Sequence, residues 1–183
     1  MSLKVDTISP TTGNTITIPS GNRMVGVDAG TFDAPPKVGS IVQMTTISTY
    51  PAAHITSTSL SESTIALVGS ITPRYSTSKI KVEFWSSMMY GAANALCLIL
   101  YRRIAGGSYS NLTPLQNTAA RYYYGWTYNA ATWASNINTY YDTPATTSLV
   151  EYVVNYRNIS STATNYVVHQ QMEYGYTLTE IYA

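Results

Sequence analysis

The feature that most constrains the fold is a series of short segments rich in Thr, Tyr, Val and Ile, which recurs from Val38 to the end of the chain. Prolines and glycines separate these segments, and both residues interrupt strand pairing. No window of helical length combines a 3.6-residue apolar period with capping residues. We therefore predict these strands: Ser40–Tyr50, Ile65–Ile71, Lys79–Ser86, Leu96–Arg103, Tyr122–Tyr128, Val150–Arg157, Asn165–Met172 and Thr177–Tyr182.

The predicted fold class is all-β. A jelly roll or β-sandwich of about eight antiparallel strands is the usual solution for a domain of this length. The segment Lys79–Phe84 alternates polar and apolar residues, so we expect its apolar side chains to face a core. The run Leu96–Leu100 is apolar without alternation, which predicts that both of its faces are covered. Cys97 lies in this run and is expected to be a buried, inert thiol, because no electropositive neighbour is in view.

The composition excludes several classes of function. The chain has 183 residues, of which 10% are charged, and a net charge of +1. A typical soluble protein has about 25% charged residues. Without a surplus of cations to neutralise phosphates, nucleic-acid binding is not expected. The 45% of hydrophobic residues can build a core, so the chain is not expected to be disordered.

The first 37 residues differ from the rest. Short, thinly apolar pieces lie between turn residues, and two prolines in Asp33–Lys37 predict a stiff, extended linker. We predict an arm and proline-containing neck over 1–37, followed by the sandwich over 38–183. The arm is too short to fold alone and needs a partner surface. Its candidate attachment residues are Leu3, Val5, Ile8, Ile16 and Ile18. Neither a signal peptide nor a membrane span is recognisable, so no membrane insertion is expected.

Three stretches of the sandwich region carry a resemblance to a known family. The first, Ile71–Val82, is similar to the strand-turn-strand pattern I-x-P-x-x-x-x-S-K-I-x-V of tail-fibre tip domains of bacteriophages and cyanophages. Tyr141–Ser148, followed by the strand Val150–Val154, is similar to their D-x-P-x-T-x-S … Y segment. Leu178–Ile181 resembles their closing L-x-E-I strand. Together with the leader segments Leu3–Ile8, Thr15–Pro19 and Val38–Gln43, the matches span almost the whole chain in the family's order.

The resemblance implies a trimeric jelly roll on a viral appendage that binds host surface polymers and carries no catalytic residues. The first reading is therefore a virion structural protein, assembled in the host cytoplasm. It is expected to be a short tail fibre or spike that attaches through its arm to tail, baseplate or capsid proteins. Its homotrimeric sandwich is expected to bind host cell-surface polysaccharide. The chain lacks a shaft, so a capsid decoration protein that stabilises the head is the alternative.

The one feature with recognition character is aromatic. The run Arg121–Tyr128 is followed by Trp133, Tyr140 and Tyr141. Consecutive tyrosines on a strand point to opposite faces, so this run cannot all enter the core. Their rings offer flat apolar faces on which sugars stack, although packing in the core or between subunits uses the same side chains. The candidate receptor-binding residues are Tyr122, Tyr124, Trp126, Tyr128, Asn129, Trp133 and Asn136, with the loop tips Tyr90–Asn94, Tyr109–Thr118 and Asn129–Asn138.

The sequence gives little support for catalysis. His54 and His169 are each interpreted as structural or surface residues, and no nucleophile motif accompanies them. No metal-ligand spacing is present, and neither a metal nor a cofactor is expected. Gly106-Gly107 predicts a hairpin turn rather than a phosphate loop.

A polysaccharide-cleaving enzyme is the most distant reading. It needs two carboxylates on one site. Glu151 and Glu173 could face each other if their strands pair, with Asp142 close by. The alternative is that these carboxylates are edge charges offset by Arg102, Arg103 or Arg157.

Overall fold

The computed structural model describes residues 36–91, 96–113, 125–127, 130–158 and 164–183. In these ranges the chain consists of strands, turns and bends, and every strand pairing is antiparallel. The all-β prediction is confirmed. The arm candidates Leu3, Val5, Ile8, Ile16 and Ile18 lie outside the described residues, and the division of the chain at residue 37 stays a prediction.

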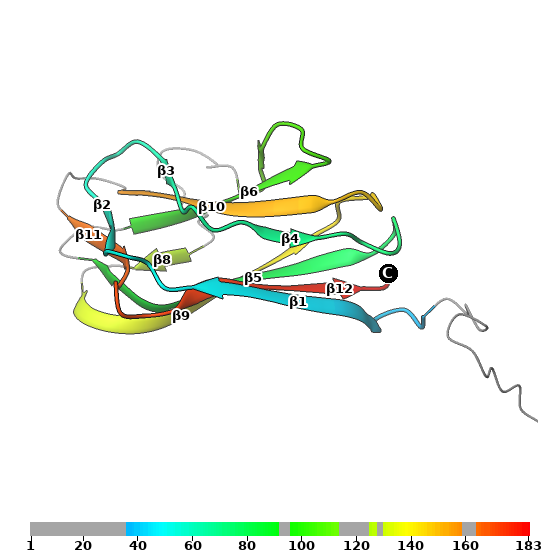
Figure 1. Ribbon diagram of the computed structural model, residues 1–183, viewed down its shortest axis with the longest axis horizontal. Coiled ribbons are helices and arrows are strands. Elements are labelled where there is room, and N and C mark those ends of the chain that lie inside the picture. Colours follow the sequence, from blue (N-terminus) through cyan, green and yellow to red (C-terminus); the bar gives the residue numbers. More distant parts are fainter. Residues whose placement is uncertain (1–35, 92–95, 114–124, 128–129, 159–163) are drawn as a thin grey trace, which may run out of the picture. The chain divides into compact units, whose positions relative to one another are not determined.

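Twelve strands of the described residues form two sheets that pack face to face as a β-sandwich (Figure 1). In sheet A, β5 pairs with β9 along one side and with β12 and then β11 along the other; β1 lies outside β12, and β2 lies outside β11. The strands of sheet A are β1 (Ile41–Thr49), β2 (Ile55–Ser57), β5 (Lys79–Gly91), β9 (Ala130–Asp142), β11 (Asn165–Val168) and β12 (Tyr174–Ile181).

Sheet B is built on the long pair of β10 and β6. The outer side of β10 pairs with two short strands, β3 and β4, and the outer side of β6 pairs with β7 and β8. The strands of sheet B are β3 (Ser63–Thr64), β4 (Gly69–Ile71), β6 (Leu96–Ile104), β7 (Ser110–Asn111), β8 (Gly125–Thr127) and β10 (Val150–Asn158).

The core lies between the sheets and follows the sequence pattern. Ile80, Val82 and Phe84 of β5 are fully buried, whereas Lys81 and Glu83 lie on the outer face. This confirms the predicted alternation of Lys79–Phe84. All five residues of Leu96–Leu100 are buried, which confirms that both faces of this run are covered. Gly69 is required where β4 of sheet B packs against β12 of sheet A, because a Cβ at this position would lie 2.8 Å from Cγ of Tyr176.

The largest error of the sequence prediction is the segment Asn129–Asn138. The sequence predicts a loop here, but β9 runs through Ala130–Asp142. Alanine and asparagine have low strand propensity, yet pairing along the whole of β5 overrides that preference. The end of β9 has the period of two that marks a strand: Asn138 is buried, whereas Ile137 and Thr139 are exposed.

Other predicted strand boundaries also differ from those in the structure. The predicted strand Ile65–Ile71 begins only at Gly69, and the predicted strand Asn165–Met172 ends at Val168 because His169–Met172 form a turn. β5 extends to Gly91, and β12 begins at Tyr174. Of the strand predicted over Tyr122–Tyr128, the described part is β8. The short strands β2, β3 and β7 were not predicted, since two or three residues carry no periodicity.

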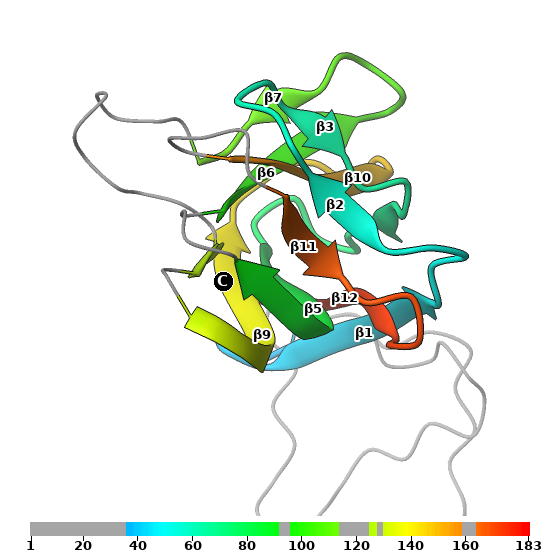
Figure 2. The same ribbon diagram turned by 90° about the vertical axis from the view of Figure 1, so that its left-hand side faces the viewer.

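The sandwich has two ends, which we name by the strands that meet there. At the near end, β1 and β5 begin and β12 ends; this is where the described chain starts, at Pro36. At the far end, β5 ends and β6, β9 and β11 begin. The near end lies to the right in Figure 1, and Figure 2 looks onto the far end.

Candidate binding site at the far end of the sandwich

At the near end, the buried carboxylate of Glu180 accepts hydrogen bonds from distant segments of the chain. The backbone N–H groups of Arg74 and Tyr75 donate to its Oε1 at 2.9 and 3.1 Å, and the Gln43 amide donates to its Oε2 at 2.6 Å. Burial by itself raises the pKa of Glu180, but the surrounding donors outweigh it and lower the pKa. Glu180 therefore fixes the turn before β5, and it links two of the stretches that resemble tail-fibre tips.

A second buried carboxylate, Asp142, ends β9. It accepts hydrogen bonds from Arg102 Nη1 and from the Tyr152 hydroxyl, both at 2.7 Å. Burial and the neighbouring Asp142 raise the pKa of the Tyr152 phenol, so the phenol remains a donor. Asp142 and Tyr152 are the first and last residues of the D-x-P-x-T-x-S … Y resemblance. Their contact gives this stretch a structural role.

The near end also has a pocket of about 260 Å³, at the hairpin between β6 and β7. Gly107 N–H donates to the Ile104 carbonyl across this turn, which confirms the predicted hairpin. Both arginines at the pocket are neutralised, because Arg102 binds Asp142 and Arg103 forms two hydrogen bonds with Glu151. The pocket thus offers no net positive charge to an anionic ligand. It is lined by Arg102, Arg103, Ile104, Gly107, Ser108 and Ser110.

The structure also shows whether Glu151 and Glu173 could form the pair of carboxylates that a polysaccharide-cleaving site needs. Glu151 lies in sheet B and binds Arg103, whereas Glu173 precedes β12 of sheet A and accepts a hydrogen bond from Ser48. The two residues do not face each other across paired strands. The prediction that an arginine offsets Glu151 is confirmed for Arg103, but Glu151 is not an edge residue, because β10 pairs with β4 and with β6 at this position. The Arg103 hydrogen bonds lower the pKa of Glu151.

The predicted binding residues divide between described and undescribed parts of the chain. Tyr122, Tyr124, Tyr128 and Asn129 lie outside the described residues. The backbone at Trp126 belongs to β8 and pairs with Cys97 of β6.

Trp133 and Asn136 belong to β9, where Asn136 pairs with Ser86 of β5. Although β8 and β9 are in different sheets, they lie beside each other toward the far end (Figure 2).

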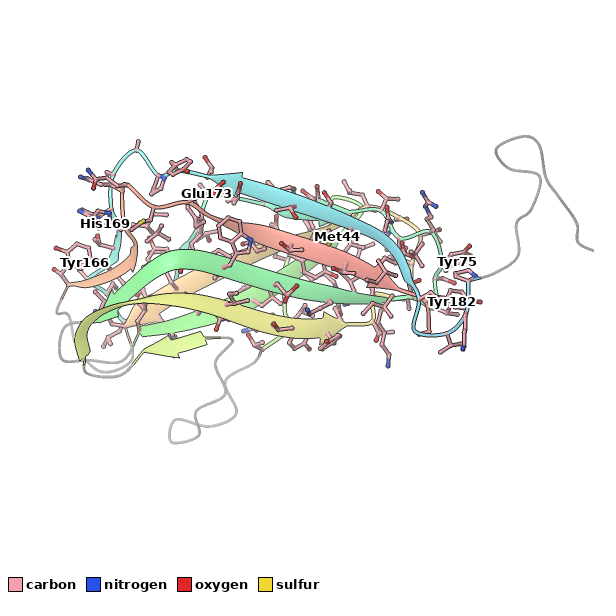
Figure 3. The ribbon with its side chains drawn as sticks, turned by 90° about the horizontal axis from the view of Figure 1, so that it is seen from below. Met44, Tyr75, Tyr166, His169, Glu173 and Tyr182 are labelled. Carbon is pink, nitrogen blue, oxygen red and sulfur yellow. The ribbon has the colours of Figure 1, made fainter. Side chains whose placement is uncertain are left out.

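The far end carries an aromatic cluster that sequence reasoning missed. The His54 ring lies 4.5 Å from the His169 ring and 5.1 Å from the Tyr166 ring, measured between centroids and in edge-on geometry. All three side chains are half-buried, and Gln170 and Gln171 beside them are exposed. Figure 3 places Tyr166 and His169 together at this end of sheet A, away from Tyr75 and Tyr182 at the near end.

Backbone hydrogen bonds fix the orientation of the two imidazoles. The Gln170 N–H donates to Nδ1 of His54 at 3.3 Å, and the Gln171 N–H donates to Nδ1 of His169 at 3.1 Å. An Nδ1 that accepts a hydrogen bond places the ring proton of a neutral histidine on Nε2. The arrangement brings three half-buried aromatic rings together beside two exposed amide side chains, and such groups suit hydroxyl-rich ligands. That each histidine is a structural or surface residue stays a prediction, and sequence reasoning missed that the two rings meet.

Other candidate chemistry is limited in the ranges that the structure describes. These contain no group of three metal-ligating side chains and no helix long and apolar enough to cross a membrane. Cys97 is buried as predicted, and burial raises the pKa of its thiol. The described part of the predicted loop Tyr109–Thr118 begins at the near end, where the Tyr109 ring lies 4.8 Å from the Arg103 guanidinium.

Comparisons with known proteins leave the function open. No family model matches the chain, and no curated protein matches it. A solved structure described as that of infectious bursal disease virus, Gx strain, is similar at 11% sequence identity with a TM-score of 0.45. The similarity covers 88% of this chain and 36% of that chain. At this identity and TM-score, the likeness carries no argument about function.

Proposed function

We propose that the chain is a virion structural protein, a short tail fibre or spike, whose sandwich binds host cell-surface polysaccharide at its far end. The observation that carries the proposal is the contrast between the ends. The chain enters the sandwich at the near end, where Gly39 N–H donates to the Tyr182 carbonyl. The aromatic cluster and the beginning of β9 lie at the opposite end. A domain anchored at one end presents the other to a ligand.

The chemistry of the far end suits a polysaccharide. Sugars stack their C–H faces on flat rings, and their hydroxyls exchange hydrogen bonds with amides and imidazole N–H groups. Tyr166, His54 and His169 supply the rings, and the exposed Gln170 and Gln171 supply amides. Trp126, Trp133 and Asn136 remain candidates for the same surface. The proposal includes no catalytic step.

The proposal also includes a homotrimer that attaches to other virion proteins through residues 1–37. Three identical sites on one trimer bind a repeating polymer with an avidity far above that of one site, so each site need bind only weakly.

Two experiments test the proposal. The first is electron microscopy of intact virus particles with gold-labelled antibody against residues 38–183. Label at the tail or baseplate supports an attachment role. Label spread over the head contradicts it in favour of a decoration protein, and particles without label overturn the virion assignment.

The second experiment compares two tyrosines at opposite ends in a polysaccharide adsorption assay. Tyr166→Ala removes a ring from the far-end cluster, whereas Tyr109→Ala removes a partly exposed ring at the near end. We expect adsorption to fall for Tyr166→Ala alone, with thermal unfolding used to check that both variants are folded. Equal adsorption of both variants and the wild type contradicts binding at the cluster.

A further inference from the structure

We infer that copies of this chain meet through the two open edges of sheet A, with β9 of one copy against β1 of the next. The inference rests on the proposed trimer and names the surfaces that form it. In the part of the chain that the structure describes, β1 pairs with β12 alone and β9 pairs with β5 alone. Each strand therefore leaves one side of its backbone open.

Both edge strands carry exposed apolar side chains. Met44 of β1 is 65% exposed, and Ile137 and Tyr141 of β9 are 67% and 58% exposed. Register places Met44 and Tyr141 on the outer face of sheet A, at opposite ends of one cross-strand row that also contains Lys81. Figure 3 looks onto this face, with Met44 midway along β1. Met, Tyr and other large apolar side chains are enriched at the cores of subunit interfaces.

The charges of this face favour another copy as the partner. The Lys81 ammonium lies 2.7 Å from the Glu83 carboxylate of the same strand, so the two charges neutralise each other. β1 contains no charged residue, and the one charge of β9, Asp142, is buried against Arg102. A second copy brings the same edge strands, so β9 of one copy meets β1 of the next without repulsion between like charges.

The outer strands of sheet B are much shorter than β1 and β9 of sheet A. Natural proteins protect open edges by keeping the edge strand short, or by placing lysine, proline or a bulge there. The outer strands of sheet B have two or three residues each. In sheet A, β9 has 13 residues without lysine or proline, and its register is regular from Asn136 to Asp142, with shifts confined to its first residues. β1 has nine residues, with a bulge confined to its first residues. Long, uncharged edges are expected where a neighbouring chain covers them.

The positions of the two edges allow the same contact to repeat from copy to copy. A contact between two different surfaces of one chain generates either a closed ring or an open filament. β1 and β9 lie on opposite sides of one sheet, so each copy offers one edge to each neighbour. Three copies joined in this way form the proposed trimer.

The experiment is a charge exchange across the contact, read by light scattering at micromolar concentration. The wild type is expected to have three chain masses. Met44→Arg and Tyr141→Glu each place a charge in every contact, so each variant is expected to fall to one chain mass. In the double variant, every contact between β9 and β1 holds one arginine and one glutamate, which restores three chain masses. Leu149→Glu, a charge at an exposed apolar residue outside both edges, leaves the trimer unchanged.

Three results overturn the inference: a monomeric wild type, single variants that remain trimers, and a double variant that stays dissociated although thermal unfolding shows it folded. The outcome is separate from that of polysaccharide binding. A monomeric wild type that still adsorbs to polysaccharide contradicts the edge contact and leaves the attachment role standing. A trimer that adsorbs to none supports the contact and contradicts the attachment role.

Discussion

The two ends of the sandwich use polar residues in different ways. At the near end, the carboxylates of Glu180 and Asp142 are buried, and their hydrogen-bond partners come from distant segments. At the far end, His54, Tyr166 and His169 are half-buried, with exposed glutamines beside them. Buried, fully bonded polar groups fix a structure, whereas partly exposed rings and amides are available to a ligand. The comparison supports a structural role for the near end, and the proposed function places ligand binding at the far end.

The largest effect is expected from Asp142→Ala. This variant leaves the Arg102 guanidinium and the Tyr152 hydroxyl without their shared acceptor. Removal of one partner of a buried ion pair costs about 3 kcal/mol or more of the free energy of unfolding. Urea denaturation measures this loss. A loss below about 1 kcal/mol contradicts the structural role of the near end.

Glu180→Gln is expected to cost about 1 to 2 kcal/mol, because it weakens the hydrogen bonds from the backbone of Arg74 and Tyr75 and disturbs the bond to Gln43. The pKa of Glu180 is lowered in the folded protein. Its contribution to stability is therefore complete above the usual glutamate pKa and is lost as the pH falls through the folded value.

Denaturation of the wild type and Glu180→Gln across the acidic range tests this pH dependence. The difference between the two free energies of unfolding should shrink as the pH falls. A difference that stays constant contradicts the account of the carboxylate.

At the far end, replacement of both Gln170 and Gln171 by alanine is expected to leave the free energy of unfolding within about 0.5 kcal/mol of the wild type, because both side chains are exposed. The backbone N–H groups that bind the histidines are retained. Adsorption to polysaccharide is expected to weaken about fivefold, which corresponds to the loss of about one hydrogen bond per site. Unchanged adsorption removes the two amides from the site.

The smallest effect is expected from Lys81→Ala. Its ion pair with Glu83 lies on the outer face of sheet A with both side chains partly exposed. Such pairs contribute less than about 1 kcal/mol, and salt screens them. Denaturation at low and high salt should show a small loss that nearly disappears in high salt. A loss comparable with that of Asp142→Ala contradicts the distinction between buried and surface ion pairs.

Much of the fold could be predicted from the sequence, because its long strands carry their periodicity locally. Alternation in Lys79–Phe84 and the continuous apolar run Leu96–Leu100 identified two central strands. β9 was missed because its alanines and asparagines gain their strand conformation from pairing with β5, a contact between distant segments.

Less of the site could be predicted. The aromatic cluster joins His54, which precedes β2, with His169, which follows β11, and only the pairing of those two strands brings the rings together. A periodicity argument treats each histidine alone. Similarly, the contact of Glu180 with the turn before β5 depends on the pairing of β12 with β5. The resemblance identified both stretches but not the hydrogen bonds between them.

Hydrogen–deuterium exchange of the full chain, with and without host polysaccharide, tests the division between the two ends most directly. The polysaccharide is expected to slow exchange in peptides covering Ala130–Asn136 and Asn165–Met172 at the far end. Peptides covering Ile71–Ile80 and Asp142–Val150 at the near end should be unchanged. Protection confined to the near-end peptides would contradict the account, because it would place the ligand on the residues assigned here to stability.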